Sequence, residues 1–337
     1  MTEHFRFLEL VSAYGISQVL HVAAELRLGD HLADSVKTSS ELAEITGADP
    51  SAIHRLLYAL ASIGIVSEES ACAFGLTPLG RHYLATDSED SLDAVARYLT
   101  HPVCWTAWAE LLYSVKTGKA AFPRIYGTSA WNYRANDPEL NRVYNAAVRA
   151  ISRGQLDAIT SQYDFSDVRV AVDVGGGNGT LLGGILAKHP QIHGVLLDQP
   201  HVVAEAADLL EVAGVADRCK IIAGDFFESV PSGGDLYVMR AVIHNWDDES
   251  AKAILGACRR AMRDDSKLLL VEGIVKPAAS LNGRFWPSFL DLHMLVTLGG
   301  RQRTCEEFAA LYASAGLRLT KVVNLPGNYD LIEGIPA

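Results

Sequence analysis

The chain is short of positive charge and lacks any long apolar run. Its 337 residues carry 29 lysines and arginines against 40 aspartates and glutamates, a formal net charge of −11. A chain this acidic is a poor candidate for nonspecific binding to nucleic acid or to anionic lipid. No apolar run approaches the ~20 residues of a membrane-spanning helix, and the N-terminus shows no apolar core of a signal peptide. The sequence therefore predicts a soluble protein with neither a nucleic-acid nor a membrane partner.

Paired cysteines are also missing. The five cysteines are scattered, odd in number and never spaced as C-x-x-C: Cys72, Cys104, Cys219, Cys258 and Cys305. This pattern argues against a disulfide framework and against a structural metal site. We expect reduced thiols, a cytoplasmic location and no metal.

The length exceeds what one core usually takes, which favours two domains. Residues 1–100 read as a helical domain with a winged-helix-like section, in which Thr38 and Glu41 form a capping-box pattern. Residues 101–160 read as a helical, aromatic-rich linker that would roof a substrate. The winged section carries only two basic residues against five acidic ones over residues 38–85. Because a DNA reader needs a basic face, we interpret it as a packing or dimerisation module.

From about residue 161 the pattern changes to short apolar runs that alternate with helical stretches. Buried strands alternating with helices predict an α/β domain, residues 161–337, with a mostly parallel sheet covered by helices on both faces. The predicted strands are VRVAVDVGGG, HGVLLDQ, CKIIAGDFF, DLYVMRAVI and SKLLLVEGIV, and LRLTKVVNLPGNYDLIEGIP predicts a closing hairpin.

A glycine-rich turn, AVDVGGGNGTLL, follows the first predicted strand. Gly175, Gly177 and Gly179 let the chain turn sharply and let a ligand approach the backbone. The dinucleotide fingerprint G-x-G-x-x-G fails, because its last position falls on Thr180. Asp198 ends the next strand, where it can accept hydrogen bonds from ribose hydroxyls. Together these features favour a nucleoside ligand over a simple tight turn.

Other charged residues fall at the carboxyl ends of the predicted strands, where an open α/β sheet binds ligands. They are Asp173, Asp225 and Arg240, and Phe226 offers a flat face suited to adenine. Several acids and no phosphate-binding lysine favour a cationic ligand without phosphates. S-adenosylmethionine has those properties.

The stretch RAVIHNWDDES places His244 at the rim of the same crevice. A phenol, with a pKa near ~10, is mostly protonated at neutral pH, and a neutral imidazole can take its proton. The alternative is a histidine that only packs at a strand end. Its position beside the cofactor-type strands favours catalysis.

The order and spacing of several motifs resemble one known family along nearly the whole chain. The motifs are HVAAELRLGDHL, VDVGGGNG, LLDQPHVV, GDFF, HNWDDE and GGRQRTCEEF. They are similar to the S-adenosylmethionine-dependent small-molecule O-methyltransferases of bacteria and plants. The resemblance implies a homodimer joined through the N-terminal domain. It also implies methylation of an aromatic secondary metabolite, as in antibiotic biosynthesis, with S-adenosylhomocysteine as the second product.

The resemblance also implies roles in binding the cofactor. Gly175, Gly177 and their neighbours would hold its methionine part, Asp198 the ribose, and Asp225 with Phe226 the adenine. Arg240 stands where the family commonly has lysine, which keeps the charge but not the shape.

The same resemblance makes His244 the general base and Glu272 the acid that flanks it. Asn245 stands where most members have Asp, and Gln302 where many have a second flanking Glu. With two neutral residues at these positions, we expect His244 to be a weaker base than in most members. It would then suit an acidic acceptor such as a hydroxyquinone or an electron-poor phenol.

Aromatic residues predict the walls of the acceptor pocket, since flat side chains can clamp a flat ring. The candidate pocket residues are Trp105, Trp108, Trp131, Phe289, His293 and Met294, together with Asn245 and Gln302.

Three other functions stay open. The first keeps the fold and the cofactor but performs a hydroxylation, decarboxylation or ring closure, which the neutral Asn245 and Gln302 would accommodate. The second is an NAD-linked enzyme, against which the incomplete fingerprint counts. The third is a DNA-binding regulator, against which the acidic winged section counts.

Overall fold

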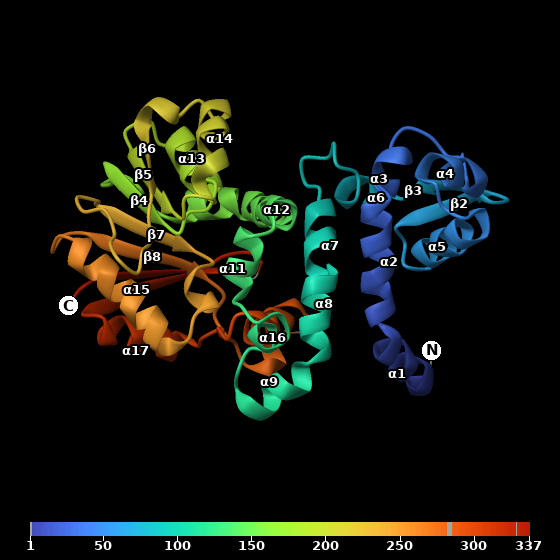
Figure 1. Cartoon of the computed structure of the whole chain (residues 1–337). Coiled ribbons are helices and arrows are strands. Elements are labelled where there is room, and N and C mark those ends of the chain that lie inside the picture. The colour runs from blue at the N-terminus through green and yellow to red at the C-terminus, as the bar shows by residue number, and fades with distance from the viewer. Residues whose placement is uncertain (1, 282–284, 328) are drawn as a thin grey trace. The chain divides into compact units, whose positions relative to one another are not determined.

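The computed structural model describes residues 2–281, 285–327 and 329–337. The chain divides into two compact units (Figure 1). The first comprises Met1–Thr106 and Pro138–Gly154, and the second comprises Ala107–Asp137 and Gln155–Ala337. Each unit is described by itself below.

The first unit is mainly helical and contains a small three-stranded sheet. Thr38 and Glu41 form the predicted capping box at the start of α4, and Gly47 closes that helix in the left-handed conformation. Helices α4 and α5 followed by the antiparallel hairpin β2–β3 give the winged-helix-like arrangement expected from the sequence. Its elements are α1 (Glu3–Ser12), α2 (Tyr14–Glu25), α3 (Leu28–His31), β1 (Lys37–Thr38), α4 (Ser39–Thr46), α5 (Pro50–Ser62), β2 (Val66–Ser70), β3 (Ala73–Leu76), α6 (Pro78–Tyr83) and α7 (Asp93–Leu99).

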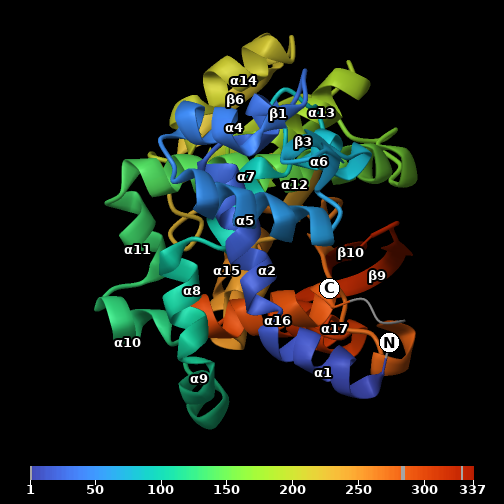
Figure 2. The same ribbon diagram turned by 90° about the vertical axis from the view of Figure 1, so that its right-hand side faces the viewer.

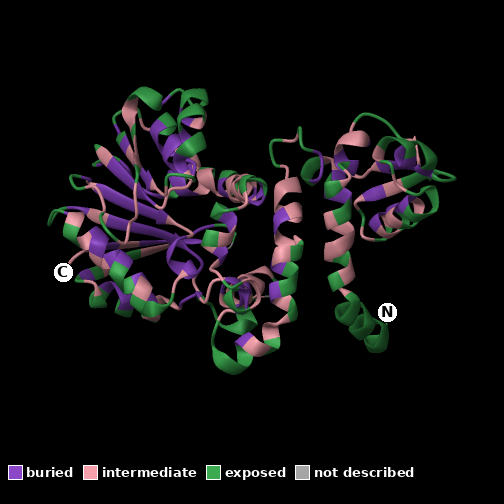
Figure 3. Ribbon diagram, in the orientation of Figure 1, coloured by how far each residue is buried: buried purple, intermediate pink, exposed green. Residues whose placement is uncertain are grey.

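Helix α1 buries none of its residues, although it is rich in large apolar side chains. Figure 3 shows it exposed along its length. Phe5, Phe7 and Leu10 are 60%, 66% and 65% exposed. No single helix among the described residues is long and apolar enough to cross a membrane; the bent pair α1 and α2 passes by length and composition together.

The second unit is built on a seven-stranded sheet with the order β6-β5-β4-β7-β8-β10-β9. The first five strands are parallel, and the β9–β10 hairpin, red in Figure 2, adds antiparallel to β8. The predicted α/β fold, with its mostly parallel sheet and closing hairpin, is therefore confirmed. The strands are β4 (Val170–Val174), β5 (His193–Asp198), β6 (Cys219–Ala223), β7 (Leu236–Arg240), β8 (Lys267–Glu272), β9 (Leu317–Asn324) and β10 (Asp330–Pro336).

Two apolar cores cover the two faces of this sheet. Side chains alternate along β7, so that Val238 packs into one core while Tyr237 and Met239 pack into the other. The Val238 core contains residues of α12, α13 and α14, and the other core contains residues of α15 and α17. Helices therefore cover both faces, as continuous apolar strands require.

The remaining helices precede the large sheet or connect its strands. They are α8 (Pro102–Ala109), α9 (Leu111–Thr117), α10 (Phe122–Tyr126), α11 (Ala130–Ala135), α12 (Pro138–Gln162), α13 (Thr180–Lys188), α14 (Ala206–Val212), α15 (Asp248–Ala261), α16 (Trp286–Thr297) and α17 (Cys305–Ser314), with short 3₁₀ turns η1 (Val203–Glu205), η2 (Ala216–Arg218), η3 (Ile243–Asn245) and η4 (Ala278–Leu281). Strand order reverses between β4 and β7, and the crevice at such a point is where open α/β sheets bind ligands.

Candidate active site

The glycine-rich turn joins β4 to α13. Gly175, Gly177 and Gly179 have φ values of +70°, +64° and +82°, which a side chain would strain. A Cβ at Gly175 would lie 3.0 Å from Val242 and 3.3 Å from the ring of Phe226. Glycine at these positions therefore allows the turn and lets β4, β6 and β7 converge at their carboxyl ends.

Two carboxylates lie at the ends of the strands beside this turn. Asp198 accepts the backbone N–H of Gly177 at 2.8 Å and that of Gln199 at 2.7 Å, and burial raises its pKa despite these bonds. Asp173 is fully buried, and burial together with the nearby Asp198 raises its pKa to about 7. Asp198 shapes the glycine turn directly, whereas Asp173 lies sealed beneath it against Gly176.

The ends of β6 and β7 supply the other predicted cofactor residues. Asp225 accepts the backbone N–H of Phe227 at 2.8 Å. Arg240 donates from Nε and Nη2 to the side-chain oxygen of Gln155, at 3.1 and 3.0 Å, and its guanidinium lies 5.4 Å from the ring of Tyr329. Gln155 and Tyr329 were not singled out in the sequence, since neither lies in a motif.

His244 and Glu272 come together although 28 residues separate them. Nδ1 of His244 lies 2.7 Å from Oε2 of Glu272, and their side chains are 6% and 0% exposed. The other Glu272 oxygen accepts the backbone N–H groups of Val242, Ile243 and His244 at 2.9, 2.7 and 3.3 Å. In the described part of the chain, Nε2 of His244 has no hydrogen-bond partner, and this atom is not completely buried. It is the nitrogen that can face an acceptor.

The turn before His244 is held by Asn245. Ala241 has a φ of +54°, which is costly for a residue with a side chain. Nδ2 of Asn245 donates to the carbonyl of Ala241 at 2.9 Å. Asn245 therefore closes the turn that presents His244.

Arg303, which lies between α16 and α17 in the sequence, also supports the loop that carries His244. This side chain is 1% exposed and donates to the carbonyls of Ile243 at 3.2 Å and Trp246 at 2.9 Å. It also donates twice to Oδ1 of Asp248, at 2.9 and 2.7 Å. Arg303 thus donates hydrogen bonds to the backbone on both sides of His244. The sequence did not predict this role.

Glycine and glutamine precede Arg303 in the GGRQRT stretch. A Cβ at Gly300 would lie 2.1 Å from the carbonyl oxygen of His244, so only glycine fits there. Gln302 is 7% exposed, and neither atom of its side-chain amide has a partner in the described chain. Its backbone N–H donates to Asp291 of α16 at 2.7 Å. The side chain of Gln302 therefore offers a buried donor and a buried acceptor that make no hydrogen bond within the described chain.

Near-parallel rings form one candidate wall of the acceptor pocket. The rings of Trp108 and Phe289 stack at 5.0 Å and 6°, and His293 lies 5.9 Å from Phe289 at 17°. Trp108 also donates from Nε1 to Nδ1 of His293 at 3.0 Å. Met294 is buried beside them in α16.

The other aromatic candidates lie apart from this stack. Trp131 stacks on Trp246 at 5.9 Å and 16°, and Arg134 lies 4.5 Å over its ring. Trp105 belongs to the first unit, where it packs against Tyr14 at 5.8 Å and stays 39% exposed. The structure therefore does not bring Trp105 into one unit with the other candidates.

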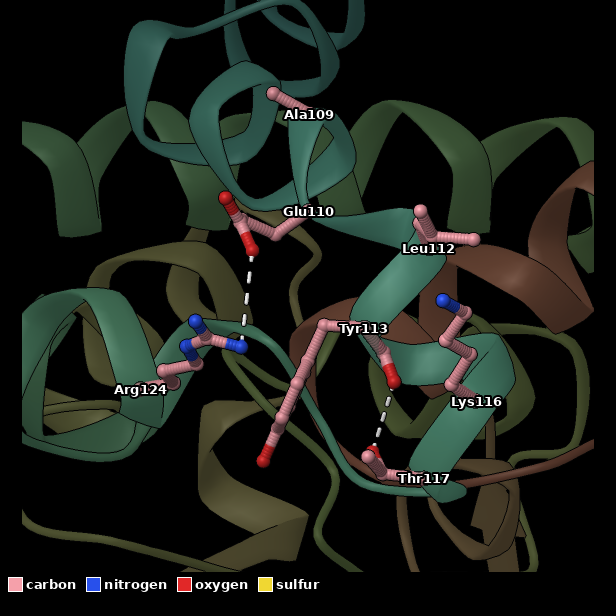
Figure 4. A pocket seen from close by; sticks show the side chains of 7 residues that line it. All are labelled: Ala109, Glu110, Leu112, Tyr113, Lys116, Thr117 and Arg124. Atoms are coloured by element: carbon pink, nitrogen blue, oxygen red, sulfur yellow. Dashed lines mark hydrogen bonds and ion pairs between the residues drawn. The ribbon is translucent and has the colours of Figure 1, made fainter.

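A separate hollow of about 350 Å³ lies on α9 and α10 (Figure 4). Its Arg124 pairs with Glu110 at 3.9 Å and covers the ring of Tyr113 at 4.5 Å. None of its lining residues belongs to the predicted site. In the described ranges, no group of three or more His, Cys, Asp or Glu is placed to hold a metal ion.

Comparison with known proteins identifies the family. Residues 108–318 match the model of an O-methyltransferase domain, and residues 8–86 match that of an O-methyltransferase dimerisation domain. The chain belongs to the O-methyltransferase family and is an S-adenosylmethionine-dependent O-methyltransferase.

Several relatives are similar over nearly their whole length. The chain is 39% identical to a phenazine O-methyltransferase (PhzM) of Lysobacter antibioticus, covering 98% of this chain and 95% of that protein. The crystal structure of LaPhzM superposes with a TM-score of 0.95 at 38% identity, with full coverage of both chains. An O-methyltransferase (NcsB1) from neocarzinostatin biosynthesis, solved with S-adenosylmethionine and 2-hydroxy-5-methyl naphthoic acid, gives 0.82 at 30% identity, covering 96% of each chain. The aclacinomycin 10-hydroxylase RdmB of Streptomyces purpurascens is 33% identical, covering 93% of this chain and 86% of that protein.

The residues at the switch point fit a cationic nucleoside. The glycine turn leaves open space at Gly177, where a Cβ would meet nothing within 4 Å. The carboxylate of Asp198 accepts the N–H of Gly177, the ring of Phe226 lies against Gly175, and Asp225 adds a second carboxylate after β6. Acidic groups favour a positively charged sulfonium over a pyrophosphate.

Proposed function

We propose that this enzyme methylates a hydroxyl group of a planar aromatic secondary metabolite, with His244 as the general base. The observation that carries the proposal is the pair His244 and Glu272. Oε2 of Glu272 lies 2.7 Å from Nδ1 of the imidazole, while Nε2 stays open at the carboxyl edge of the sheet. The stacked rings of Trp108 and Phe289 supply a flat wall for the acceptor.

The proposed roles divide between binding and proton transfer. Gly175, Gly177, Asp198, Asp225 and Phe226 would hold the cofactor, with Asp173 and Arg240 supporting the strand ends around them. Bound S-adenosylmethionine supplies a methyl group that its sulfonium already activates.

The chain's own contribution is alignment and a base. The acceptor oxygen forms the new bond to carbon as the carbon–sulfur bond breaks and its electron pair goes to sulfur. Nε2 of His244 takes the hydroxyl proton, and Glu272 balances the positive charge that develops on the imidazole. Base assistance of this kind is worth roughly 10²–10⁴ in rate.

We further propose a cytoplasmic homodimer joined through the first unit. The match to a dimerisation domain and the exposed apolar face of α1 support the dimer. Cys72, Cys219, Cys258 and Cys305 carry free thiols, which suits a reducing compartment.

Relatives guide the choice of substrates for the test. The purified enzyme is incubated with S-adenosylmethionine and hydroxylated phenazines, naphthoates and quinones, and both products are measured. We expect S-adenosylhomocysteine to accumulate in step with a methylated product, and His244→Ala to lower the rate roughly 10²–10⁴-fold while cofactor binding persists. Near-normal turnover in that variant would remove His244 from the mechanism. A changed substrate without S-adenosylhomocysteine would instead favour the second candidate, a reaction such as that named for the hydroxylase relative.

A further inference from the structure

The side chains of Trp108 and His293 fix one protonation state of the imidazole. The indole Nε1–H is a donor only, and it lies 3.0 Å from Nδ1 of His293. Nδ1 must therefore offer its lone pair. A neutral imidazole carries one ring proton, so that proton resides on Nε2.

The surroundings of His293 keep it neutral. The side chain is 4% exposed, and burial disfavours a charged imidazolium. Positive charge on Arg134 of α11 or on His244 of η3 opposes it further, and together these effects lower the pKa of His293 to about 4. The imidazole therefore keeps the same donor and acceptor pattern across the physiological pH range.

The Nε2–H of His293 makes no hydrogen bond within the described chain. No residue of the described chain accepts a hydrogen bond from it, and it is not among the buried polar atoms that lack a partner, so it opens onto the adjoining space. The ring itself lies nearly parallel to Phe289, at 17°, in the stacked wall. A flat molecule against this wall would meet a fixed donor at its edge.

We propose that His293 is a specificity-determining residue whose Nε2–H donates a hydrogen bond to a carbonyl or similar acceptor oxygen of the aromatic substrate. This inference rests on the proposed function and narrows its substrate class. The substrate carries a hydroxyl that gives its proton to His244 and a second oxygen that accepts from His293. Hydroxyquinones and hydroxylated aromatic ketones or carboxylic acids have both groups.

The tautomer is tested directly by nitrogen NMR on the full-length protein labelled with ¹⁵N-histidine, with His293→Gln used to assign the resonances. We expect an unprotonated Nδ1 and a protonated Nε2 for His293, unchanged from pH 8 down to pH 5.5. In Trp108→Phe, which keeps an aromatic ring but removes the donor, the two tautomers should mix. A protonated Nδ1 in the wild-type protein, or titration near pH 6.5, overturns the inference.

Substrate recognition is tested with two probes that differ in the acceptor oxygens, 2-hydroxyanthraquinone and 2-hydroxyanthracene. Their affinities are measured by calorimetry on the protein loaded with S-adenosylhomocysteine. We expect the wild-type enzyme to prefer the quinone about tenfold or more, which a single hydrogen bond can supply. His293→Phe should abolish this preference, and His293→Gln, which keeps an N–H donor, should restore part of it.

Equal binding of both probes by the wild-type enzyme, binding of neither, or a preference that survives in His293→Phe overturns the inference. Failure of the proposed function is a separate result. It would appear as the absence of S-adenosylhomocysteine formation with the whole hydroxylated panel, whatever the binding preference.

Discussion

The carboxylate of Glu272 contacts His244 with both of its oxygens. One lies 2.7 Å from Nδ1 of the imidazole, and the other accepts the backbone N–H of the same residue at 3.3 Å. The imidazole of His244 and the turn that carries it are therefore both contacted by one fully buried side chain at the end of β8.

Two substitutions of Glu272 separate these two roles. Glu272→Gln keeps an oxygen for the backbone N–H groups of the η3 turn but loses the charge beside Nδ1. We expect a folded enzyme whose kcat falls roughly 10²–10⁴-fold. Glu272→Ala leaves three backbone donors without an acceptor and should also lower the free energy of unfolding by several kcal/mol. Urea unfolding and turnover of both variants check this; equal stability of the two would contradict the capping role.

Arg303 should matter for both folding and turnover. Arg303→Met removes the side-chain donor from the part-buried carbonyl of Trp246 and one of two donors from the buried carbonyl of Ile243, which keeps the backbone N–H of Trp246 at 3.2 Å. We expect a loss of roughly 2–5 kcal/mol in unfolding free energy. The matched control is Arg301→Met, because Arg301 also lies near Asp248, at 3.4 Å, but is exposed. The control should change stability by less than about 1 kcal/mol. Similar effects in the two variants would show that Arg303 does not support the loop.

Substituting Asn245 distinguishes two explanations for why this position carries a neutral side chain. If its amide closes the turn at Ala241, Asn245→Asp puts a carboxylate oxygen against a carbonyl oxygen and should cost roughly 1–3 kcal/mol of stability, together with turnover. Ala241→Gly, which relieves the positive φ, should be tolerated. A faster Asn245→Asp enzyme would instead show that the neutral residue weakens the base.

The contacts that hold the His244 loop could not be predicted from the sequence, whereas much of the fold could. The alternating strands, the glycine turn and Asp198 follow from local patterns, because strand burial and left-handed glycines are properties of short stretches. Local spacing gave no sign that Arg303 would reach the carbonyl of Ile243, 60 residues earlier. The same holds for Gly300 against His244, since both contacts depend on how the chain returns across the sheet. Glu272 was placed by family resemblance rather than by spacing.

Asp173 should make stability depend on pH. Its pKa in the folded protein, raised to about 7 by burial and by Asp198, exceeds the ordinary value of 3.8. The stability that the protonated group contributes is complete below pH 3.8 and is lost as the pH rises towards 7. Relative to Asp173→Asn, the wild-type protein should lose up to about 3 kcal/mol of unfolding free energy between pH 5 and pH 8. Urea unfolding at both pH values measures this, and a constant difference between the two proteins would contradict it.

The apolar face of α1 should be required for dimerisation. Replacing Phe7 and Leu10 by serine removes side chains that are 66% and 65% exposed in the single chain. We expect light scattering after gel filtration to show a dimer for the wild-type protein and a monomer for the double variant. Val212→Ser, which changes an 87% exposed residue of the second unit, is the control and should stay dimeric. A double variant that remains dimeric would place the interface elsewhere.

The supports of His244 come from β8, the loop around Asn245 and the buried Arg303, whereas the proposed ring wall comes from α8 and α16. Under the proposed mechanism, reactivity and selectivity would be carried by different parts of the second unit. Exchanging side chains along one face of α16 could retarget the enzyme to a new acceptor while its proton-transfer machinery is left intact. That separation makes α16 the natural segment to randomise when such a catalyst is adapted to unfamiliar scaffolds.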